Sequence, residues 1–267
     1  MFDYHVHSDF SADCKTPMEK SINRAIELGL AEICFTEHID YEYPDPTIDF
    51  DLDLAGYETK INQMRNKYQD QITIRKGVEI GVQPYLLERY KQLMKKEEFD
   101  FIICSMHTAN KKDLHSGDFF RGRKPEDAYE AYYNELLYCV RNFKDFSILG
   151  HLDLVKRYKQ EPVNHNCSEI IAAIFKEIIA AEKGIELNTS GVRYGLNNGM
   201  PSKDILELYF ELGGEIITIG SDSHMEKTIS YQFKESVELL KTIGFRYITT
   251  YKNLVPVFHS IDSVLNK

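Results

Sequence analysis

The segment FIICSMH at residues 101–107 is a short apolar run that ends at a histidine. Its length and its content of β-branched and aromatic residues favour a buried strand. Comparable runs recur along the chain, at residues 2–5, 32–35, 72–79, 101–104, 146–149, 185–187 and 215–219. Longer segments with helical periodicity alternate with them, near residues 17–29, 53–68, 84–96, 126–142, 168–182, 203–212 and 231–242.

This alternation predicts parallel strands joined by right-handed crossovers. Seven strand–helix units indicate a closed or nearly closed α/β barrel rather than an open sheet. We expect a last short run at 247–250 and a final helix from about Val255. No low-complexity tract or linker divides the chain, so we expect one domain over residues 1–267. Two long loops, 39–52 and 107–125, follow strands and are expected to overhang the catalytic face as lids.

Composition excludes several classes of protein. The formal net charge of −10 argues against a broad basic surface that binds nucleic acid. No run of 18 apolar residues occurs, and the N-terminus has no signal-peptide pattern, so we expect no membrane span. The five cysteines are odd in number and form no CxxC, which favours the reducing cytoplasm. The sequence does not indicate an oligomeric state.

Potential metal ligands stand at the ends of almost all the expected strands. They are His5, His7, Glu37, His38, Glu79, His107, His151, Asp222 and His224, and Glu186 lies within the sixth run. In α/β barrels the carboxyl ends of the strands form one face, which carries the catalytic residues. Carboxylates gathered there would repel one another and take up protons, whereas divalent cations remove that cost. Mixed imidazole and carboxylate ligation suits Zn, Fe or Mn.

Each of these residues alone has an ordinary explanation. Asp222 and His224 resemble residues that cap a helix, and a single His-x-His pair is a weak signal. The hypothesis depends on the coincidence of ligand types at successive strand ends. His165 and His259 do not lie at strand ends, and we expect them at the surface.

The motifs together resemble those of the polymerase-and-histidinol-phosphatase (PHP) superfamily. They occur in the family's order and span residues 5–224: His-Val-His-Ser at 5–8, Thr-Glu-His at 36–38, Gly-Val-Glu-Ile at 77–80, Ser-Met-His at 105–107, Gly-His-Leu-Asp at 150–153 and Ser-Asp-Ser-His at 221–224. The segments His-Ser-Asp-Phe-Ser at 7–11 and Glu-Leu-Asn-Thr-Ser-Gly-Val-Arg at 186–193 resemble the histidinol-phosphate phosphatase branch.

The resemblance implies a distorted seven-stranded (β/α) barrel with up to three divalent metal ions. It implies a first ion held by His5, His7, Glu79 and Asp222, and a second held by Glu79, His107 and His151. It implies a third ion held by His38 and His224 with Asp13, a position where some relatives have histidine. The implied reaction is hydrolysis of L-histidinol phosphate to L-histidinol and phosphate, a step of histidine biosynthesis.

We expect a hydroxide that bridges two ions to attack phosphorus, with His38, Asp222 and His224 as catalytic residues. Arg157 and Arg193 are the expected phosphate contacts, because arginine forks match phosphate oxygens. Asp153, Glu186 or an acid of the 39–52 loop are candidates for the substrate ammonium, and His115, Tyr41 and Tyr43 for its imidazole. The leaving-group proton is left open between Asp222 and a water on the third ion.

Other activities of the same superfamily remain alternatives, namely a protein-tyrosine phosphatase or a nucleotide phosphatase. A regulatory metal-binding barrel without turnover predicts missing ligands, whereas nearly all are present here. An amidohydrolase commonly bridges its metals with a carboxylated lysine. No lysine stands at such a strand end, and Glu79 takes that place.

Overall fold

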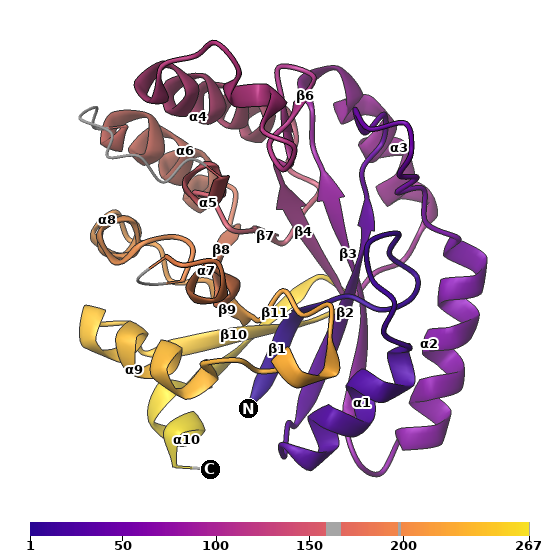
Figure 1. Cartoon of the computed structure of the whole chain (residues 1–267). Helices are drawn as coiled ribbons and strands as arrows, with labels where there is room; N and C mark the ends of the chain where they lie inside the picture. Colours follow the sequence, from indigo (N-terminus) through magenta and orange to yellow (C-terminus); the bar gives the residue numbers. More distant parts are fainter. Residues whose placement is uncertain (159–166, 197–198, 267) are drawn as a thin grey trace.

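Seven parallel strands form one sheet in the order β1-β2-β3-β4-β7-β8-β9 (Figure 1). The computed structural model describes residues 1–158, 167–196 and 199–266. The strands are β1 Phe2–Val6, β2 Glu32–Ile39, β3 Thr73–Gly81, β4 Phe101–Ser105, β7 Ile148–Leu149, β8 Gly184–Asn188 and β9 Ile217–Gly220. A parallel bridge joins Val6 to Ser223, just after β9. The sheet therefore nearly closes, which confirms the predicted distorted (β/α)7 barrel.

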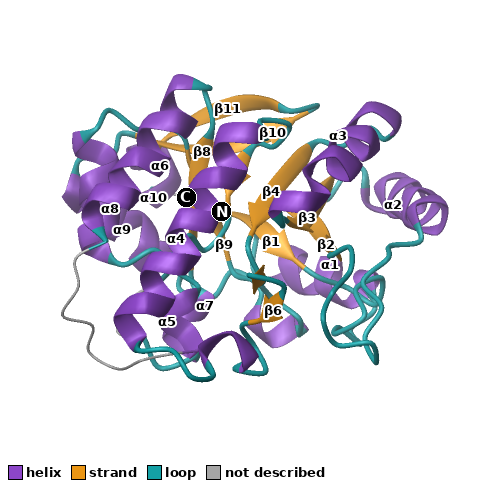
Figure 2. Cartoon of the chain, turned by 90° about the horizontal axis from the view of Figure 1, so that it is seen from above, coloured by secondary structure: helices purple, strands orange, loops and turns teal. Residues whose placement is uncertain are grey.

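Helices surround the barrel on the outside (Figures 1 and 2). The main ones are α1 Met18–Glu27, α2 Leu54–Tyr68, α3 Leu87–Lys96, α4 Pro125–Asn142, α6 Ser168–Ala180, α8 Lys203–Glu211 and α9 Phe233–Ile243. In α1, Met18, Ile22 and Ala25 follow helical spacing and are all buried, so one face of the helix packs against the strands. Among the described residues, no helix is both long and apolar enough to cross a membrane.

Two short helices follow strands in the second half of the barrel. They are α5 Val155–Tyr158 after β7 and α7 Ser190–Arg193 after β8. Neither helix is among the elements predicted from the sequence, because one turn of helix is too short to show a periodic pattern. Each helix carries one of the two arginines expected to contact phosphate, Arg157 in α5 and Arg193 in α7. The helices therefore set the backbone positions of these two arginines.

The predicted final helix from Val255 is wrong. Residues Tyr247–Lys252 form β10 and Val255–Ser260 form β11, an antiparallel hairpin. Asn253 and Leu254 make the tight turn with φ of 50° and 64°. A short helix, α10, covers only Ile261–Leu265. Short apolar runs do not distinguish helix from strand by periodicity, which explains the error.

The hairpin closes the amino-terminal end of the barrel. The Tyr251 amide donates to the Tyr4 hydroxyl at 2.9 Å, and the rings of Tyr251 and Phe101 lie 5.0 Å apart. Ile103 and Ile148 are fully buried in the same cluster. Because side chains fill the barrel from this end, a site can open only at the carboxyl ends of the strands.

The two long loops lie at that open end. The first, residues 39–52, has no helix or strand after Ile39. The second contains a small hairpin, β5 Thr108–Ala109 with β6 Lys112–Asp113, and the 3₁₀ helix Asp118–Phe120. Tyr43 and Phe50 from the first loop and Asp113 and His115 from the second line one cavity. Both loops therefore cover the site as expected.

Candidate metal centre

The structure brings the side chains at the strand ends into one cluster. Four overlapping groups have ligand atoms that all lie within 4.8 Å of one another: His5 with His7 and Asp222, His5 with Glu79 and His151, His38 with Glu79 and His107, and His7 with His38 and His224. Eight of the nine predicted strand-end ligands occur in these groups. They come from β1, β2 and β3 and from the segments that follow β4, β7 and β9. Glu37 does not occur in them; its carboxylate accepts hydrogen bonds from the hydroxyls of Ser8 and Ser11 at 2.5 and 2.6 Å.

Glu79 lies at the centre of the cluster and is only 1% exposed. Its two carboxylate oxygens lie within 3.4 Å of ring nitrogens of five histidines: His5, His7, His38, His107 and His151. Strand β3 places Glu79 beside His38 of β2, in register with it. A carboxylate shared by imidazoles on both sides is suited to bridge two ions.

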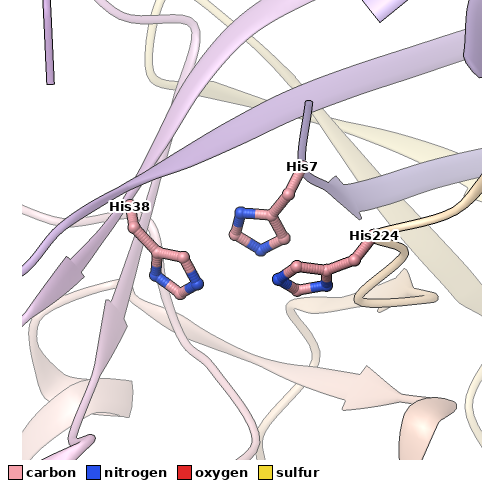
Figure 3. Close-up of side chains that lie close together, drawn as sticks. All are labelled: His7, His38 and His224. Atoms are coloured by element: carbon pink, nitrogen blue, oxygen red, sulfur yellow. The ribbon is translucent and has the colours of Figure 1, made fainter. Parts of the chain in front are cut away.

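The side chains of His7, His38 and His224 lie close together (Figure 3). His7 stacks against His38 and His224, with ring centroids 4.2 and 4.3 Å away. Asp13, from the loop before α1, lies 3.1 Å from His224 Nε2 and 3.6 Å from His38 Nε2. Asp13 therefore lies where the family resemblance placed it.

Protonation of the cluster follows from this crowding. Burial alone would lower the pKa of His38, but Asp13 and Glu79 raise it to about 9. Burial likewise opposes the shift in His107, whose pKa is nevertheless raised well above its usual value by Asp40 and Glu79. His7 behaves in the opposite way: burial and the neighbouring His38 lower its pKa to about 3. In the metal-free protein, His38 and His107 are therefore cations that offset the negative charge of the carboxylates, whereas His7 is neutral.

Several buried ring nitrogens support metal binding. His7 Nε2, His38 Nδ1 and His151 Nδ1 have no hydrogen-bond partner among the described residues. A buried polar atom without a partner costs about 1–3 kcal/mol, and native proteins rarely leave one. His7 Nε2 and His38 Nδ1 lie 3.4 and 3.3 Å from Glu79 Oε2, so an ion beside Glu79 would give these two nitrogens a partner. The donor set of imidazole and carboxylate therefore fits divalent transition metals.

Asp40 is a residue of the site that sequence reasoning did not single out. It follows β2, and its Oδ2 accepts a hydrogen bond from His107 Nδ1 at 2.8 Å. This contact leaves His107 Nε2 facing Glu79 at 3.2 Å. The only signal in the sequence was its position at the start of the 39–52 loop, directly after a strand.

The cluster forms one wall of a cavity of about 320 Å³. Arg157 also lines this cavity, beside the cluster, with Nη1 3.6 Å from Asp222 Oδ2 and its guanidinium 3.3 Å from the ring centre of Tyr194. Tyr158 and His115 line the same space, with their ring centroids 5.7 Å apart. The guanidinium therefore offers N–H donors to an anion that binds in the cavity next to the cluster.

Arg193 has a different environment from Arg157. Its Nη1 donates to the Ser221 carbonyl at 2.8 Å, and its Nη2 donates to the Asp222 carbonyl at 2.9 Å. Asp222 has φ of 52°, a left-handed conformation that is uncommon outside glycine. Arg193 thus supports the backbone that presents Asp222. It is not among the residues that line the cavity, and phosphate contact by its remaining N–H groups stays a prediction.

Other candidates lie away from the cavity. Asp153 accepts from Lys156 and from the Ser202 amide, and Tyr41 stacks on Tyr90. Neither lines the cavity, whereas Tyr43 and His115 do. His259 is half-buried, with its ring 4.5 Å from that of Phe2. His165 lies outside the described residues.

Comparisons with known proteins agree with this geometry. A model of the PHP domain matches residues 3–190. The chain is 34% identical over 258 residues to the histidinol-phosphatase of Lactococcus lactis subsp. lactis (strain IL1403), with 94% of each chain covered. It is 31% identical to a probable histidinol-phosphatase of Clostridium acetobutylicum, over 96% of this chain and 98% of the relative.

A solved structure is similar over nearly the whole chain. It is the histidinol phosphate phosphatase of Lactococcus lactis subsp. lactis Il1403 complexed with zinc, L-histidinol and phosphate. The TM-score is 0.86 at 32% identity, with 96% of this chain and 98% of that chain covered. On the strand-end ligands, the barrel and these matches, the chain belongs to the PHP domain family.

Proposed function

We propose that the chain is a metal-dependent phosphatase that hydrolyses L-histidinol phosphate to L-histidinol and phosphate, a step of histidine biosynthesis. The observation that carries this proposal is one cavity that is lined both by members of the imidazole–carboxylate cluster and by Arg157. Relatives that cover almost the whole chain are histidinol-phosphatases, which supports the choice of substrate.

Three divalent ions, of Zn, Fe or Mn, fit the cluster. We assign the first to His5, His7, Glu79 and Asp222, and the second to Glu79, His107 and His151. We assign the third to Asp13, His38 and His224. Bound there, the ions would supply positive charge that offsets the charge of the reacting phosphoryl group.

The protein's own groups have separable tasks in the hydrolysis. Arg157 would hold phosphoryl oxygens with its planar guanidinium, which Tyr194 keeps in place. Burial would raise the pKa of Asp222, but His5, His224 and Arg157 lower it. Asp222 is therefore ionised at neutral pH, which is the form that can hold a divalent ion. We place His38 and His224 with Asp222 in the catalytic set because all three line the cavity.

The rest of the cavity suits the amino-alcohol end of the substrate. Asp113 Oδ1 accepts from the Tyr43 hydroxyl at 2.8 Å and from the His115 amide at 2.9 Å. These contacts fix a carboxylate on the cavity wall, where it would meet an ammonium group. The rings of Tyr43 and His115 would contact the substrate imidazole. Sequence reasoning had not singled out Asp113, although it lies within the predicted 107–125 lid.

One assay tests the proposal. The metals bound to the purified protein are measured, and phosphate release is compared for L-histidinol phosphate, a phosphotyrosine peptide, nucleotides and a simple aryl phosphate. We expect the highest kcat/KM on L-histidinol phosphate and loss of that activity after chelation. An equal kcat/KM on the aryl phosphate would refute the substrate assignment, and activity that survives complete removal of metal would refute the metal centre.

A pair of variants tests the substrate pocket separately. Asp113→Asn is expected to lower kcat/KM on L-histidinol phosphate and to leave the aryl phosphate unaffected. Asp262→Asn is the control, because Asp262 is exposed, does not line the cavity and pairs with Lys241 Nζ at 2.7 Å. Equal effects of Asp113→Asn on both substrates would remove Asp113 from the pocket.

Two broader assignments accompany the proposal. We infer that residues 1–267 act as one phosphoesterase domain, since ligands are drawn from β1 to the segment after β9 and the hairpin of β10 and β11 seals the same barrel. We infer a cytoplasmic location, because all five cysteines are unpaired thiols.

A further inference from the structure

Glu186 is a buried carboxylate that lies beneath the cluster rather than on the cavity wall. It belongs to β8, is 1% exposed and does not line the cavity. Its Oε1 lies 2.7 Å from His5 Nδ1. Its Oε2 accepts from the His151 amide at 3.1 Å and from Asn188 Nδ2 at 3.0 Å.

These contacts join three strand ends through one side chain. His5 lies on β1, His151 follows β7, and Glu186 itself lies on β8. On the other side of the His5 ring, Nε2 faces Glu79 Oε2 at 3.0 Å and Asp222 Oδ1 at 3.9 Å. His5 therefore presents one nitrogen to Glu186 and the other to the cluster of ligands.

From this geometry we propose that Glu186 is a positioning residue of the metal centre. The Glu186 carboxylate holds the proton of His5 on Nδ1, so that Nε2 carries the free lone pair directed at the metal. It also fixes the main chain that presents His151. The inference rests on the proposed metal-dependent function and adds to it the residue that selects the tautomer and orientation of a ligand.

One glycine provides space that this carboxylate needs. A Cβ at Gly220 would overlap Glu186 Oε1 and the Cβ of His5, well inside 3.0 Å. The end of β9 thus lacks a side chain where Glu186 approaches His5.

A neutral amide cannot replace the carboxylate here. Both oxygens of Glu186 accept hydrogen bonds, one from His5 and one from the His151 amide. In Glu186→Gln, an amide oxygen facing His5 would place the NH₂ group against the His151 N–H, donor against donor. An amide oxygen facing His151 would offer a donor to His5 Nδ1, which moves the imidazole proton to Nε2 and blocks coordination there.

The test compares zinc binding by three full-length proteins. Metal is removed by chelation, and zinc affinity is measured by competition with a chromophoric chelator for wild type, Glu186→Gln and Glu186→Asp. Thermal unfolding of the metal-free proteins is recorded in parallel. We expect Glu186→Gln to weaken zinc binding by roughly 10- to 100-fold, as loss of such outer partners typically does. Glu186→Asp keeps the two acceptors and is expected to bind more tightly than Glu186→Gln.

Asp100→Asn is the matched control for loss of a buried carboxylate. Asp100 accepts from Arg65 Nη2 at 2.6 Å, from the Lys76 amide at 3.0 Å and from the Asn253 amide at 3.1 Å, at the opposite end of the barrel. This variant should lower the unfolding temperature without changing zinc affinity. Equal loss of zinc affinity in Asp100→Asn and Glu186→Gln would overturn the proposal, because a general loss of stability would then explain both.

A spectroscopic measurement on the wild type tests the same proposal and does not depend on whether a variant folds. Long-range ¹H–¹⁵N spectra of the zinc-loaded protein, labelled at histidine, report which ring nitrogen carries the proton. We expect His5 to be protonated on Nδ1, and a proton on Nε2 would overturn the assignment. If Glu186→Gln binds zinc as tightly as the wild type does, the positioning role of Glu186 is refuted, whereas the metal centre is not. If the wild type binds no zinc, the metal centre and the role of Glu186 are both refuted.

Discussion

Replacement of Gly81 by alanine is expected to damage the site without altering any ligand. Gly81 ends β3, two residues after Glu79. An added Cβ would lie far inside 3.0 Å of Asp40 Oδ1 and 3.1 Å from Asp40 Oδ2. The Asp40 carboxylate must therefore move, and it is this carboxylate that accepts from His107 Nδ1 at 2.8 Å. Movement of Asp40 releases the His107 ring.

The size of the effect follows from that hydrogen bond. The His107 side chain is 16% exposed and that of Asp40 is 5% exposed, so solvent screens the pair only weakly. A hydrogen bond that involves a charged group contributes about 1.5–3 kcal/mol. At about 1.4 kcal/mol for each factor of ten, Gly81→Ala should weaken zinc affinity, or kcat, by about 10- to 100-fold.

A double-mutant cycle identifies the cause. Asp40→Ala alone should cost about as much as Gly81→Ala, because both remove the same contact. In the Asp40→Ala background, Gly81→Ala should cost less than about 0.5 kcal/mol, since no carboxylate remains to be displaced. Zinc affinity and kcat on L-histidinol phosphate are measured for all four proteins. Full activity of Gly81→Ala, or additive losses in the double variant, would refute the reasoning.

Three further outcomes can be checked on the same protein. His107→Asn should lower kcat by more than the roughly 100-fold cost of losing an outer partner, with an unchanged circular dichroism spectrum; retained activity would contradict the ligand assignment. Arg157→Lys should lower kcat/KM by about 10-fold or more, because an ammonium cannot replace a guanidinium fork; an unchanged kcat/KM would remove Arg157 from the phosphate site. Zinc binding near pH 7.5 should release protons, since the pKa of His38 is raised to about 9, and the release should decline as the pH rises through 9. Calorimetry in two buffers of different ionisation enthalpy measures this number, and zero release would contradict the raised pKa.

The pKa of His38 also implies a direction for the stability of the metal-free protein. Its ion pair with Asp13 is absent from the unfolded chain, where histidine titrates near 6.5. The contribution of the pair is fully present below that pH and disappears as the pH rises through about 9. Thermal unfolding of the metal-free wild type and His38→Asn should therefore differ most at mildly acidic pH.

The sequence predicted the ligand ring because the ring follows strand geometry. His5 and His7 are two residues apart, and residues at that spacing point to the same side of a strand. His38, Glu79 and His107 each end an apolar run, and parallel pairing brings such ends together. These facts need only the order of the strands, which short apolar runs and intervening helices reveal. The structure therefore places all the expected strand-end ligands except Glu37 in one cluster.

Residues that depend on the exact packing were not predictable in the same way. Asp40 acts on His107 because Gly81, on a neighbouring strand, has no side chain, and no local pattern links these positions. Asp113 reaches the cavity only through the small hairpin that folds within the 107–125 loop. The hairpin formed by β10 and β11 was misread since its second strand is short and apolar. In each case the deciding contact joins segments distant in sequence.

The contrast between His7 and its neighbours bears on how the centre fills with metal. The pKa of His7 is lowered to about 3 by burial and by the nearby His38, so its imidazole is neutral and ready to coordinate at any physiological pH. His38 and His107 have raised pKa values and must lose a proton before they bind an ion. Zinc therefore competes with protons at some ligands and not at others. A stepwise zinc titration should therefore show an affinity that rises with pH up to about 9, where His38 loses its proton without help from an ion, and that levels off at higher pH.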